Sequence, residues 1–257
     1  MKILLVSDTH GRTDAVNGLA AATGADCCFH LGDLCAYTRS SVSQFSADML
    51  YKQLRHAPQL SPEQLAAIDR EDAEAMRSLA LEYHTYGNFE DYLSGNKRFD
   101  IPVYAVCGNN DDAVIIAQLE KRPISNLTFL NEAKQLEWAG FLIVGIGGDI
   151  AERPPKTGVG CISTEVQIAE LERKTAAATG KKILLTHVPP YDCERLMQLV
   201  ETIKPVLVLC GHTHHWDDRM AGNSRILTLP RIDRGYAVLE LSGDRWDIKI
   251  HRQGDGI

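Results

Sequence analysis

The chain has 257 residues, of which 44% are hydrophobic, and it carries a formal net charge of −7. This length is enough for one large α/β domain. The acidic balance argues against a broad basic face that wraps duplex nucleic acid, although it is compatible with a small anionic substrate held by metal ions.

The seven cysteines are scattered along the chain, and none of them forms a C-x-x-C pair. An odd and unpatterned set is typical of reduced thiols in the cytoplasm rather than of a disulfide framework. The first residues, MKILLVSD, enter an apolar strand without the features of a signal peptide. No apolar run approaches the roughly 20 residues that span a bilayer. We therefore expect a cytoplasmic protein that does not bind membranes.

Short apolar runs that end in a polar or glycine-containing turn recur along the chain. Near-continuous runs of this kind indicate strands buried on both faces of a layered α/β protein. They lie at residues 2–8, 27–33, 102–109, 141–149, 182–187 and 205–212. The last runs, RILTLP, YAVLEL and RWDIKIH, alternate more and have no helix between them, which predicts an antiparallel closing sheet.

Helices are predicted between several of these strands. The clearest begins at Ser61, where Gln64 completes a capping box, and it continues to Gly87. Two further helices are predicted over residues 163–180, with a start at the serine, and over residues 192–205, with an apolar face.

About seventy residues separate the second strand from the third, far more than the connection requires. We interpret residues 36–100 as a helical insertion beside the main sheet, within a single domain of residues 1–257. The insertion is either an ordinary set of crossover helices or a cap that shapes the substrate pocket. The sequence leaves both interpretations open.

Side chains with metal-ligating atoms follow five of the apolar strands, at the edge where α/β sheets build their sites. Residues two apart on an extended segment point the same way, so Asp8 and His10 can face one pocket, as can His212 and His214. Carboxylate, amide and imidazole ligands together suit Mn, Fe, Ni or Zn rather than Ca. The candidate ligands are Asp8, His10, Asp33, Asn109, His187, His212 and His214.

Other polar residues carry weaker signals. Arg12 follows DTHG at a predicted helix start, where it either binds a substrate phosphate as a bidentate donor or is simply exposed. Arg153 and Lys156 lie in a loop from which they can reach substrate, although a plain surface loop is the commoner outcome. We expect His30 to be a core histidine and His215 to face away from the ligands.

The ordered set D-x-H, G-D, G-N-x-D, H and G-H-x-H, each after an apolar strand, resembles the calcineurin-like metallophosphoesterases. The similarity runs from Lys2 to about His214 and is weakest across residues 36–100. The resemblance implies a four-layer α-β-β-α sandwich of two mixed sheets flanked by helices. It also implies two divalent transition-metal ions, Mn, Fe, Ni or Zn, at the strand ends.

The resemblance further implies a role for each ligand and a reaction. One metal would bind Asp8, His10 and His214, the other would bind Asn109, His187 and His212, and Asp33 would bridge the two. A hydroxide that bridges the metals would attack the phosphorus of a small phosphate ester in line, so that no protein nucleophile is needed.

The sequence departs from the family pattern at two positions. Asn110 stands where many phosphatases carry a histidine, and an amide cannot protonate a leaving group. Asp111 is then expected to orient a neighbouring group. GDLCAY lacks a further aspartate of the protein Ser/Thr phosphatases, so small prokaryotic phosphodiesterase-like members are the closer comparison. We therefore favour phosphodiesters, and keep a phosphomonoesterase, a nuclease of the same superfamily and a non-catalytic scaffold as alternatives.

Overall fold

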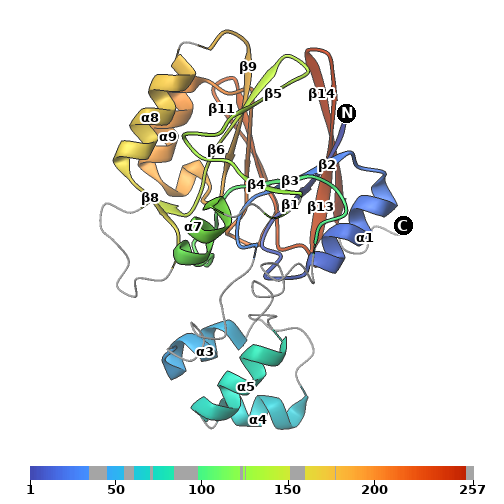
Figure 1. Ribbon diagram of the computed structural model, residues 1–257, viewed down its shortest axis with the longest axis vertical. Helices are drawn as coiled ribbons and strands as arrows, with labels where there is room; N and C mark the ends of the chain where they lie inside the picture. The colour runs from blue at the N-terminus through green and yellow to red at the C-terminus, as the bar shows by residue number, and fades with distance from the viewer. Residues whose placement is uncertain are drawn as a thin grey trace.

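The computed structural model describes residues 1–34, 45–54, 61–69, 72–83, 98–121, 124, 126–150, 160–176 and 178–252. Over these residues the chain forms two six-stranded mixed sheets that pack face to face, and helices cover the outer face of each sheet (Figure 1). The four-layer sandwich expected from the resemblance is therefore confirmed. No helix within these ranges is both long and apolar enough to cross a membrane.

The first sheet contains the first and the last strands, in the order β14-β13-β1-β2-β3-β4. The strands β1 to β4 are parallel, whereas β13 is antiparallel to both β1 and β14. Helices α1 (Thr13–Thr23) and α7 (Ala113–Lys121) pack on the outer face. The strands are β1 (Lys2–Val6), β2 (Cys27–His30), β3 (Val103–Ala105), β4 (Leu127–Phe129), β13 (Gly235–Ser242) and β14 (Arg245–Arg252).

The second sheet has the order β11-β12-β10-β9-β6-β5, with antiparallel strands at its two edges. Helices α8 (Glu165–Ala176) and α9 (Glu194–Ile203) cover it, and the predicted apolar face of α9 is buried against it. The strands are β5 (Leu136–Trp138), β6 (Phe141–Ile146), β9 (Lys181–Thr186), β10 (Leu207–Cys210), β11 (Asp217–Ala221) and β12 (Ser224–Thr228). The short parallel pair β7 (Asp149–Ile150) and β8 (Ile162–Ser163) and the 3-10 turn η1 (Pro190–Asp192) complete this half.

Strand β1 shows why these segments are apolar without a break. Ile3 and Leu5 pack between the two sheets, whereas Leu4 and Val6 pack against the outer helices, and all four side chains are fully buried. Since neighbouring side chains of a strand point to opposite faces, a strand covered on both faces needs an apolar residue at every position. The residues of β10 divide between two cores in the same way.

The helix predicted from Ser61 to Gly87 is wrong as a single element. The structure has two helices here, α4 (Pro62–Asp69) and α5 (Ala73–Tyr83), and Gly87 lies outside the described residues. The Oδ1 atom of Asp72 accepts hydrogen bonds at 3.1 and 3.0 Å from the backbone N–H groups two and three residues later. An aspartate in this position caps a helix, so it starts a second one.

The start of α4 follows the predicted capping chemistry. The Ser61 N–H donates to Gln64 Oε1 at 2.7 Å, and the Gln64 N–H donates to Ser61 Oγ at 3.3 Å. The start of α8 differs by one residue from the prediction, because Thr164 rather than Ser163 caps it. The Gln167 N–H donates to Thr164 Oγ1 at 3.4 Å.

Three helices between β2 and β3 form a cluster with a small core of its own. They are α3 (Ala47–Leu54), α4 and α5, and their buried side chains include Phe45, Leu50, Ile68 and Met76. Figure 1 shows this cluster at one end of the molecule, beyond the two sheets. That residues 36–100 act as a cap stays a prediction.

The last strands do not form one antiparallel sheet, as the sequence had suggested. Strand β12 lies in the second sheet, parallel to β10, and β11 pairs with it on the other side. The hairpin of β13 and β14 instead completes the first sheet. The chain therefore crosses from one sheet to the other over residues 229–234, and this connection begins at the carboxyl end of β12.

Candidate metal centre

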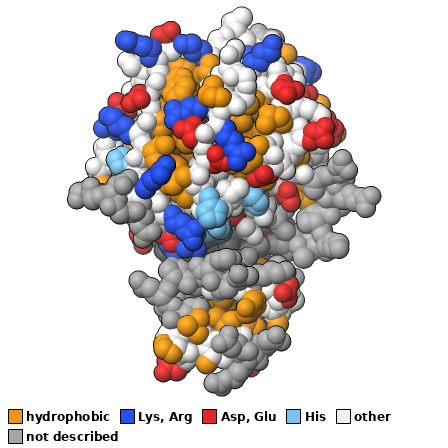
Figure 2. Space-filling model, turned by 180° about the vertical axis from the view of Figure 1, so that it is seen from behind, with side chains coloured by type: hydrophobic (Ala, Val, Ile, Leu, Met, Phe, Trp, Pro, Cys, Tyr) orange, Lys and Arg blue, Asp and Glu red, His pale blue; other side chains and the backbone are white. Residues whose placement is uncertain are grey.

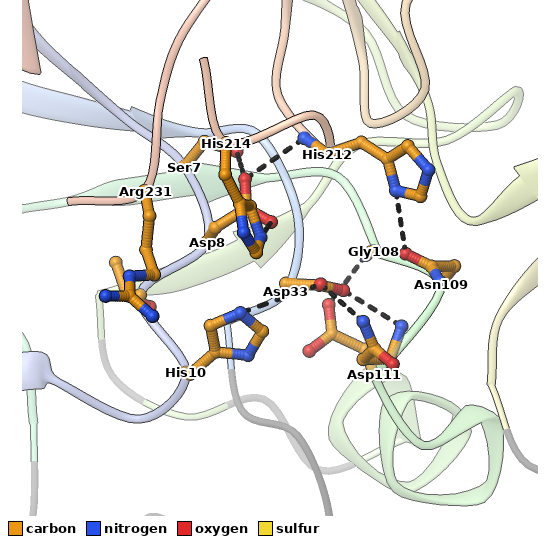
Figure 3. Close-up of polar contacts among 12 residues, drawn as sticks. Ser7, Asp8, His10, Asp33, Gly108, Asn109, Asp111, His212, His214 and Arg231 are labelled. Atoms are coloured by element: carbon orange, nitrogen blue, oxygen red, sulfur yellow. Dashed lines mark hydrogen bonds and ion pairs between the residues drawn. The ribbon is translucent and has the colours of Figure 1, made fainter. Parts of the chain in front are cut away.

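The predicted ligands lie together where five strands end, between the carboxyl edges of the two sheets (Figure 3). Strands β1, β2 and β3 of the first sheet supply Asp8, His10, Asp33 and Asn109, and β9 and β10 of the second supply His187, His212 and His214. The group is connected by short distances, such as 3.6 Å from His187 Nε2 to Asp33 Oδ1 and 3.9 Å from His10 Nε2 to Asp33 Oδ2. Residues more than 200 positions apart thus meet at one site.

Two overlapping sets of donor atoms are close enough to hold ions. Single ligand atoms of Asp8, His10 and His214 lie within 4.8 Å of one another, and so do atoms of Asp8, Asp33 and His187. The first set is the one that the resemblance implies for one metal. The second set contains both buried carboxylates and one imidazole.

The amide of Asn109 and the imidazole of His212 extend the second set. Asn109 Oδ1 lies 2.9 Å from His187 Nε2 and 3.1 Å from His212 Nδ1. An amide oxygen and two imidazole nitrogens that point at one another are a donor set suited to a borderline divalent ion. The chemistry of the whole group therefore fits two divalent transition metals, which bind oxygen and nitrogen donors of this kind.

The backbone brings these side chains together in a way that the sequence did not predict. Asp8, His10, Asp33, His212 and His214 all have positive φ angles, between 46° and 70°. The extended geometry assumed for the D-x-H and H-x-H pairs is therefore wrong, although each pair does converge. Left-handed backbone is unfavourable for residues with a side chain, and such strain clusters at functional sites.

Hydrogen bonds between the turns hold this unfavourable backbone in place. The Asp8 N–H donates to the Gly32 carbonyl at 3.0 Å, and the His10 N–H donates to the Asp33 carbonyl at 2.9 Å. Close packing adds to this, because a Cβ atom on Gly108 would overlap both the carboxylate and the backbone nitrogen of Asp33. The β3 turn can approach Asp33 only because residue 108 is a glycine.

Asp8 is fully buried and surrounded by donors. Its Oδ2 accepts from the Ser7 hydroxyl at 2.6 Å and from the His212 N–H at 3.1 Å, and its Oδ1 lies 3.1 Å from His214 Nε2. Burial acts to raise the pKa of Asp8, but the hydrogen bond with His214 and the nearby imidazoles of His187 and His10 outweigh it and hold the pKa below its ordinary value. Asp8 is therefore ionised at neutral pH.

The histidines differ in their protonation. Burial lowers the pKa values of His10 and His212, so both imidazoles are neutral and able to bind a metal at neutral pH. Burial also acts to lower the pKa of His187, but the carboxylates of Asp33 and Asp8 outweigh it and raise that pKa above its ordinary value. His187 therefore holds its proton more strongly than the other two.

The residues predicted for catalysis have clear contacts. Asn110 donates to both oxygens of Asp33, through its backbone N–H at 2.9 Å and its side-chain Nδ2 at 2.7 Å. Asp111 Oδ2 accepts from the Gly108 N–H at 2.7 Å and closes the G-N-N-D turn. Arg12 lies at the start of α1, 3.5 Å from a carboxylate oxygen of Asp233. The loop residues 153 and 156 lie outside the part of the chain that the structure describes.

His30 is buried in β2, as expected, and its Nε2 lies 2.8 Å from Thr9 Oγ1. The Thr9 hydroxyl donates to the Leu34 carbonyl at 3.0 Å, so His30 is the donor to Thr9. Its Nδ1 has no hydrogen-bond partner, and burial lowers its pKa to about 3. His30 is therefore a neutral side chain that links the β1 and β2 turns.

Sequence reasoning missed Arg231, which lies beside His10 (Figure 3). It follows β12, whose carboxyl end lies at the same edge as that of β10 because the two strands are parallel. The signal was the PRIDR segment directly after an apolar run. It was overlooked because that run was assigned to an antiparallel sheet, which would have placed its end elsewhere.

Comparison with known proteins supports the interpretation of this fold. Three solved structures share it at low sequence identity, which shows the fold alone. A dimetal phosphatase from Danio rerio has a TM-score of 0.57 and 11% identity, covering 98% of this chain and 96% of that one. The anchor in the inner membrane complex of Plasmodium has a TM-score of 0.56 and 11% identity, covering 100% and 86%. A putative 5′-nucleotidase from Staphylococcus aureus has a TM-score of 0.50 and 11% identity, covering 98% and 52%.

Among curated protein sequences, no match is found. The family model of the calcineurin-like phosphoesterases, however, matches residues 1–216, which include all the strand-end turns described above. Since this match covers most of the 257 residues, the chain belongs to the calcineurin-like phosphoesterase family.

Proposed function

We propose that this protein hydrolyses small phosphate esters with the help of two divalent transition-metal ions, and that it prefers phosphodiesters to phosphomonoesters. The observation that carries the proposal is the convergence of carboxylate, amide and imidazole donors around the buried pair Asp8 and Asp33. Family membership supports the hydrolysis of phosphate esters, and the donor set supports the metal requirement.

The geometry supports a division of the ligands between two ions. Asp8, His10 and His214 would hold one ion, Asn109, His187 and His212 would hold the other, and Asp33 lies close enough to groups of both sets to bridge them. Divalent ions, when bound, neutralise phosphoryl oxygens and make water a stronger nucleophile at neutral pH.

The protein's own residues prepare the site for this chemistry. Ser7 and the His212 backbone orient the Asp8 carboxylate, and Asn110 orients that of Asp33. Asn110 can donate a hydrogen bond to a phosphate oxygen but cannot release a proton at useful pH. Without an acid at this position, substrates with good leaving groups are favoured, and this supports the preference for diesters.

The test uses bis(p-nitrophenyl) phosphate as the diester and p-nitrophenyl phosphate as the monoester, each with the protein loaded with Mn, Fe, Ni or Zn. We expect hydrolysis of both, with the larger kcat/KM on the diester, and its loss in Asp33→Asn. The control Asp218→Asn removes a carboxylate that pairs with Arg225 on the exposed β11–β12 hairpin and retains activity. No hydrolysis of either ester with any of the metals would refute the proposal.

A further inference from the structure

Two arginines share one carboxylate beside the candidate metal centre. Asp233 accepts hydrogen bonds from Nε and Nη2 of Arg231 at 2.7 and 2.6 Å, and Arg12 Nη1 lies 3.5 Å from the same carboxylate. The side chains of Arg231, Asp233 and Arg12 are 13%, 25% and 33% exposed, so this cluster lies at the surface without being fully solvated. A bidentate contact of this kind fixes the plane of a guanidinium group.

The cluster borders the His10 and His214 side of the metal centre. Figure 3 shows Arg231 next to His10, with Asn109 and Asp111 on the other side of Asp33. The positive charge of Arg231 contributes to the lowered pKa of His10, which places the two groups in electrostatic contact. A third arginine, Arg234, donates from Nη1 to the His214 carbonyl at 3.5 Å.

The charges of this side are not balanced by the cluster itself. Three guanidinium groups against the one Asp233 carboxylate leave two positive charges, in a protein whose net charge is −7. The space-filling view shows basic side chains directly beside histidines on the face that it presents (Figure 2). A local basic region on an acidic protein attracts and orients anions.

The two arginines are also held by turns that already position ligands. The Arg12 N–H donates to the Thr9 carbonyl at 3.1 Å, within the turn that carries His10. The Arg234 N–H donates to the Arg231 carbonyl at 2.8 Å, within the connection from β12 to β13. Because both turns are fixed, the guanidinium groups form a prepared site rather than flexible surface charges.

We propose that Arg231 and Arg12, oriented by Asp233, bind a second anionic group of the substrate, so that the preferred substrates are phosphodiesters that carry a further phosphate. This inference rests on the proposed function. The scissile phosphate is expected among the donors around Asp33, and Arg231 lies outside that group, beyond His10 in Figure 3. A second phosphate on the same substrate is the group that reaches the cluster.

Two chromogenic diesters test this directly. Thymidine 5′-(p-nitrophenyl phosphate) has only the scissile phosphate, whereas its 3′-phosphorylated form adds a second one and releases the same leaving group. We expect the wild type to prefer the 3′-phosphorylated diester by roughly tenfold to a hundredfold in kcat/KM, the range expected for charge-assisted hydrogen bonds. In Arg231→Gln and Arg12→Gln this ratio falls toward one, mainly through KM, and Arg231→Lys restores part of it.

Arg225→Gln is the matched control, because Arg225 makes a similar bidentate pair with Asp218 at 2.9 and 2.7 Å on the exposed β11–β12 hairpin. This variant keeps the wild-type ratio. Circular dichroism and the thermal midpoint identify any variant that fails to fold, and the second arginine variant then decides.

Binding without turnover separates this inference from the proposed function. Titration calorimetry compares thymidine 3′,5′-bisphosphate with thymidine 5′-monophosphate, and we expect the bisphosphate to bind at least roughly tenfold more tightly, a difference that Arg231→Gln removes. If the wild type cleaves neither diester but still shows this difference, the proposed function fails and the anion site stands. Equal affinities in the wild type, or equal losses on both diesters in the variants, would overturn the anion site.

Discussion

Asn110 contacts both carboxylate oxygens of Asp33. Its backbone N–H donates to Oδ1 at 2.9 Å, and its side-chain amide donates to Oδ2 at 2.7 Å. Asp33 is 1% exposed, so these two bonds fix the orientation of a buried carboxylate that lies near His10 and His187. The residue that replaces the histidine of many phosphatases thus has a structural role of its own at the proposed bridging ligand.

Replacing Asn110 by histidine tests whether the missing acid limits the reaction. The backbone bond to Asp33 is retained, and an imidazolium can protonate a leaving group. We expect Asn110→His to raise kcat/KM on diesters with poor leaving groups by roughly tenfold or more, and to change it little on good ones. The measurement is the slope of log kcat/KM against leaving-group pKa, which becomes shallower.

Asn110→Ala is the control for that variant, because it removes the amide without adding an acid. Its activity falls on both kinds of leaving group, and the slope stays as in the wild type. If Asn110→His also leaves the slope unchanged, the argument that links this residue to a preference for diesters is wrong.

Divalent ions are expected to stabilise the fold, because the proposed ligands are in place only when the turns of both sheets meet. A ligand at one hundred times its Kd stabilises by about 2.7 kcal/mol, which for a chain of this size raises Tm by roughly 5–10 °C. Differential scanning fluorimetry with and without Mn²⁺ or Zn²⁺ measures the shift. Asp33→Asn should abolish most of it, and a shift of wild-type size in that variant would contradict the assigned ligands.

The positions of the buried strands and their turns could be predicted because they depend on local sequence alone. A strand covered on both faces is apolar throughout, and parallel neighbours bring their carboxyl ends to one edge. This is why Asp8, Asp33 and His187 could be expected near one another although no local pattern connects them. The β12 strand failed the same test, because its run does not show which sheet it joins, and Arg231 was missed with it.

The backbone at the ligands could not be predicted from the sequence. His212 and His214 were expected to converge through extended geometry, but both have positive φ angles. Such angles are held by contacts with other turns, among them the bond from the His212 N–H to Asp8, 204 positions away. A local pattern does not contain this information. The break at Asp72 is different, since its capping signal was present in the sequence and was outweighed by a long helical pattern.

Gly108 is predicted to be required for both folding and metal binding. Any Cβ atom there would collide with Asp33, and at least part of that contact is with backbone, which cannot move aside. Gly108→Ala should lower the free energy of unfolding by about 1–3 kcal/mol and weaken metal binding. Chemical denaturation and metal titration measure the two effects.

Gly18→Ala is the matched control for that substitution. Gly18 lies within α1, where an added Cβ meets no atom within 4 Å. Alanine is the better helix former, so this change should raise the free energy of unfolding by about 0.5–1 kcal/mol and leave metal binding unaltered. If both substitutions behave alike, the close approach of the β3 turn to Asp33 is not what the glycine provides.

Metal binding should release a proton from His187, and the release should depend on pH. The carboxylates of Asp33 and Asp8 raise the pKa of His187 in the metal-free protein. A raised pKa stabilises the fold fully below the unfolded value of about 6.5, and this contribution is lost as the pH rises through the folded value. An imidazolium cannot ligate, so a metal must displace this proton. The metal affinity therefore rises with pH across the same interval.

The other ligands contribute little to this proton release near neutral pH. Burial lowers the pKa values of His10 and His212, so they are already neutral, and the lowered pKa of Asp8 keeps it ionised. Calorimetric titration of Mn²⁺ in buffers of different ionisation enthalpy should show about one proton released near pH 6 and fewer near pH 8.5. The release near pH 6 should disappear in His187→Gln and persist in His10→Gln. A release that is independent of pH, or that survives in His187→Gln, would show that another group carries the proton.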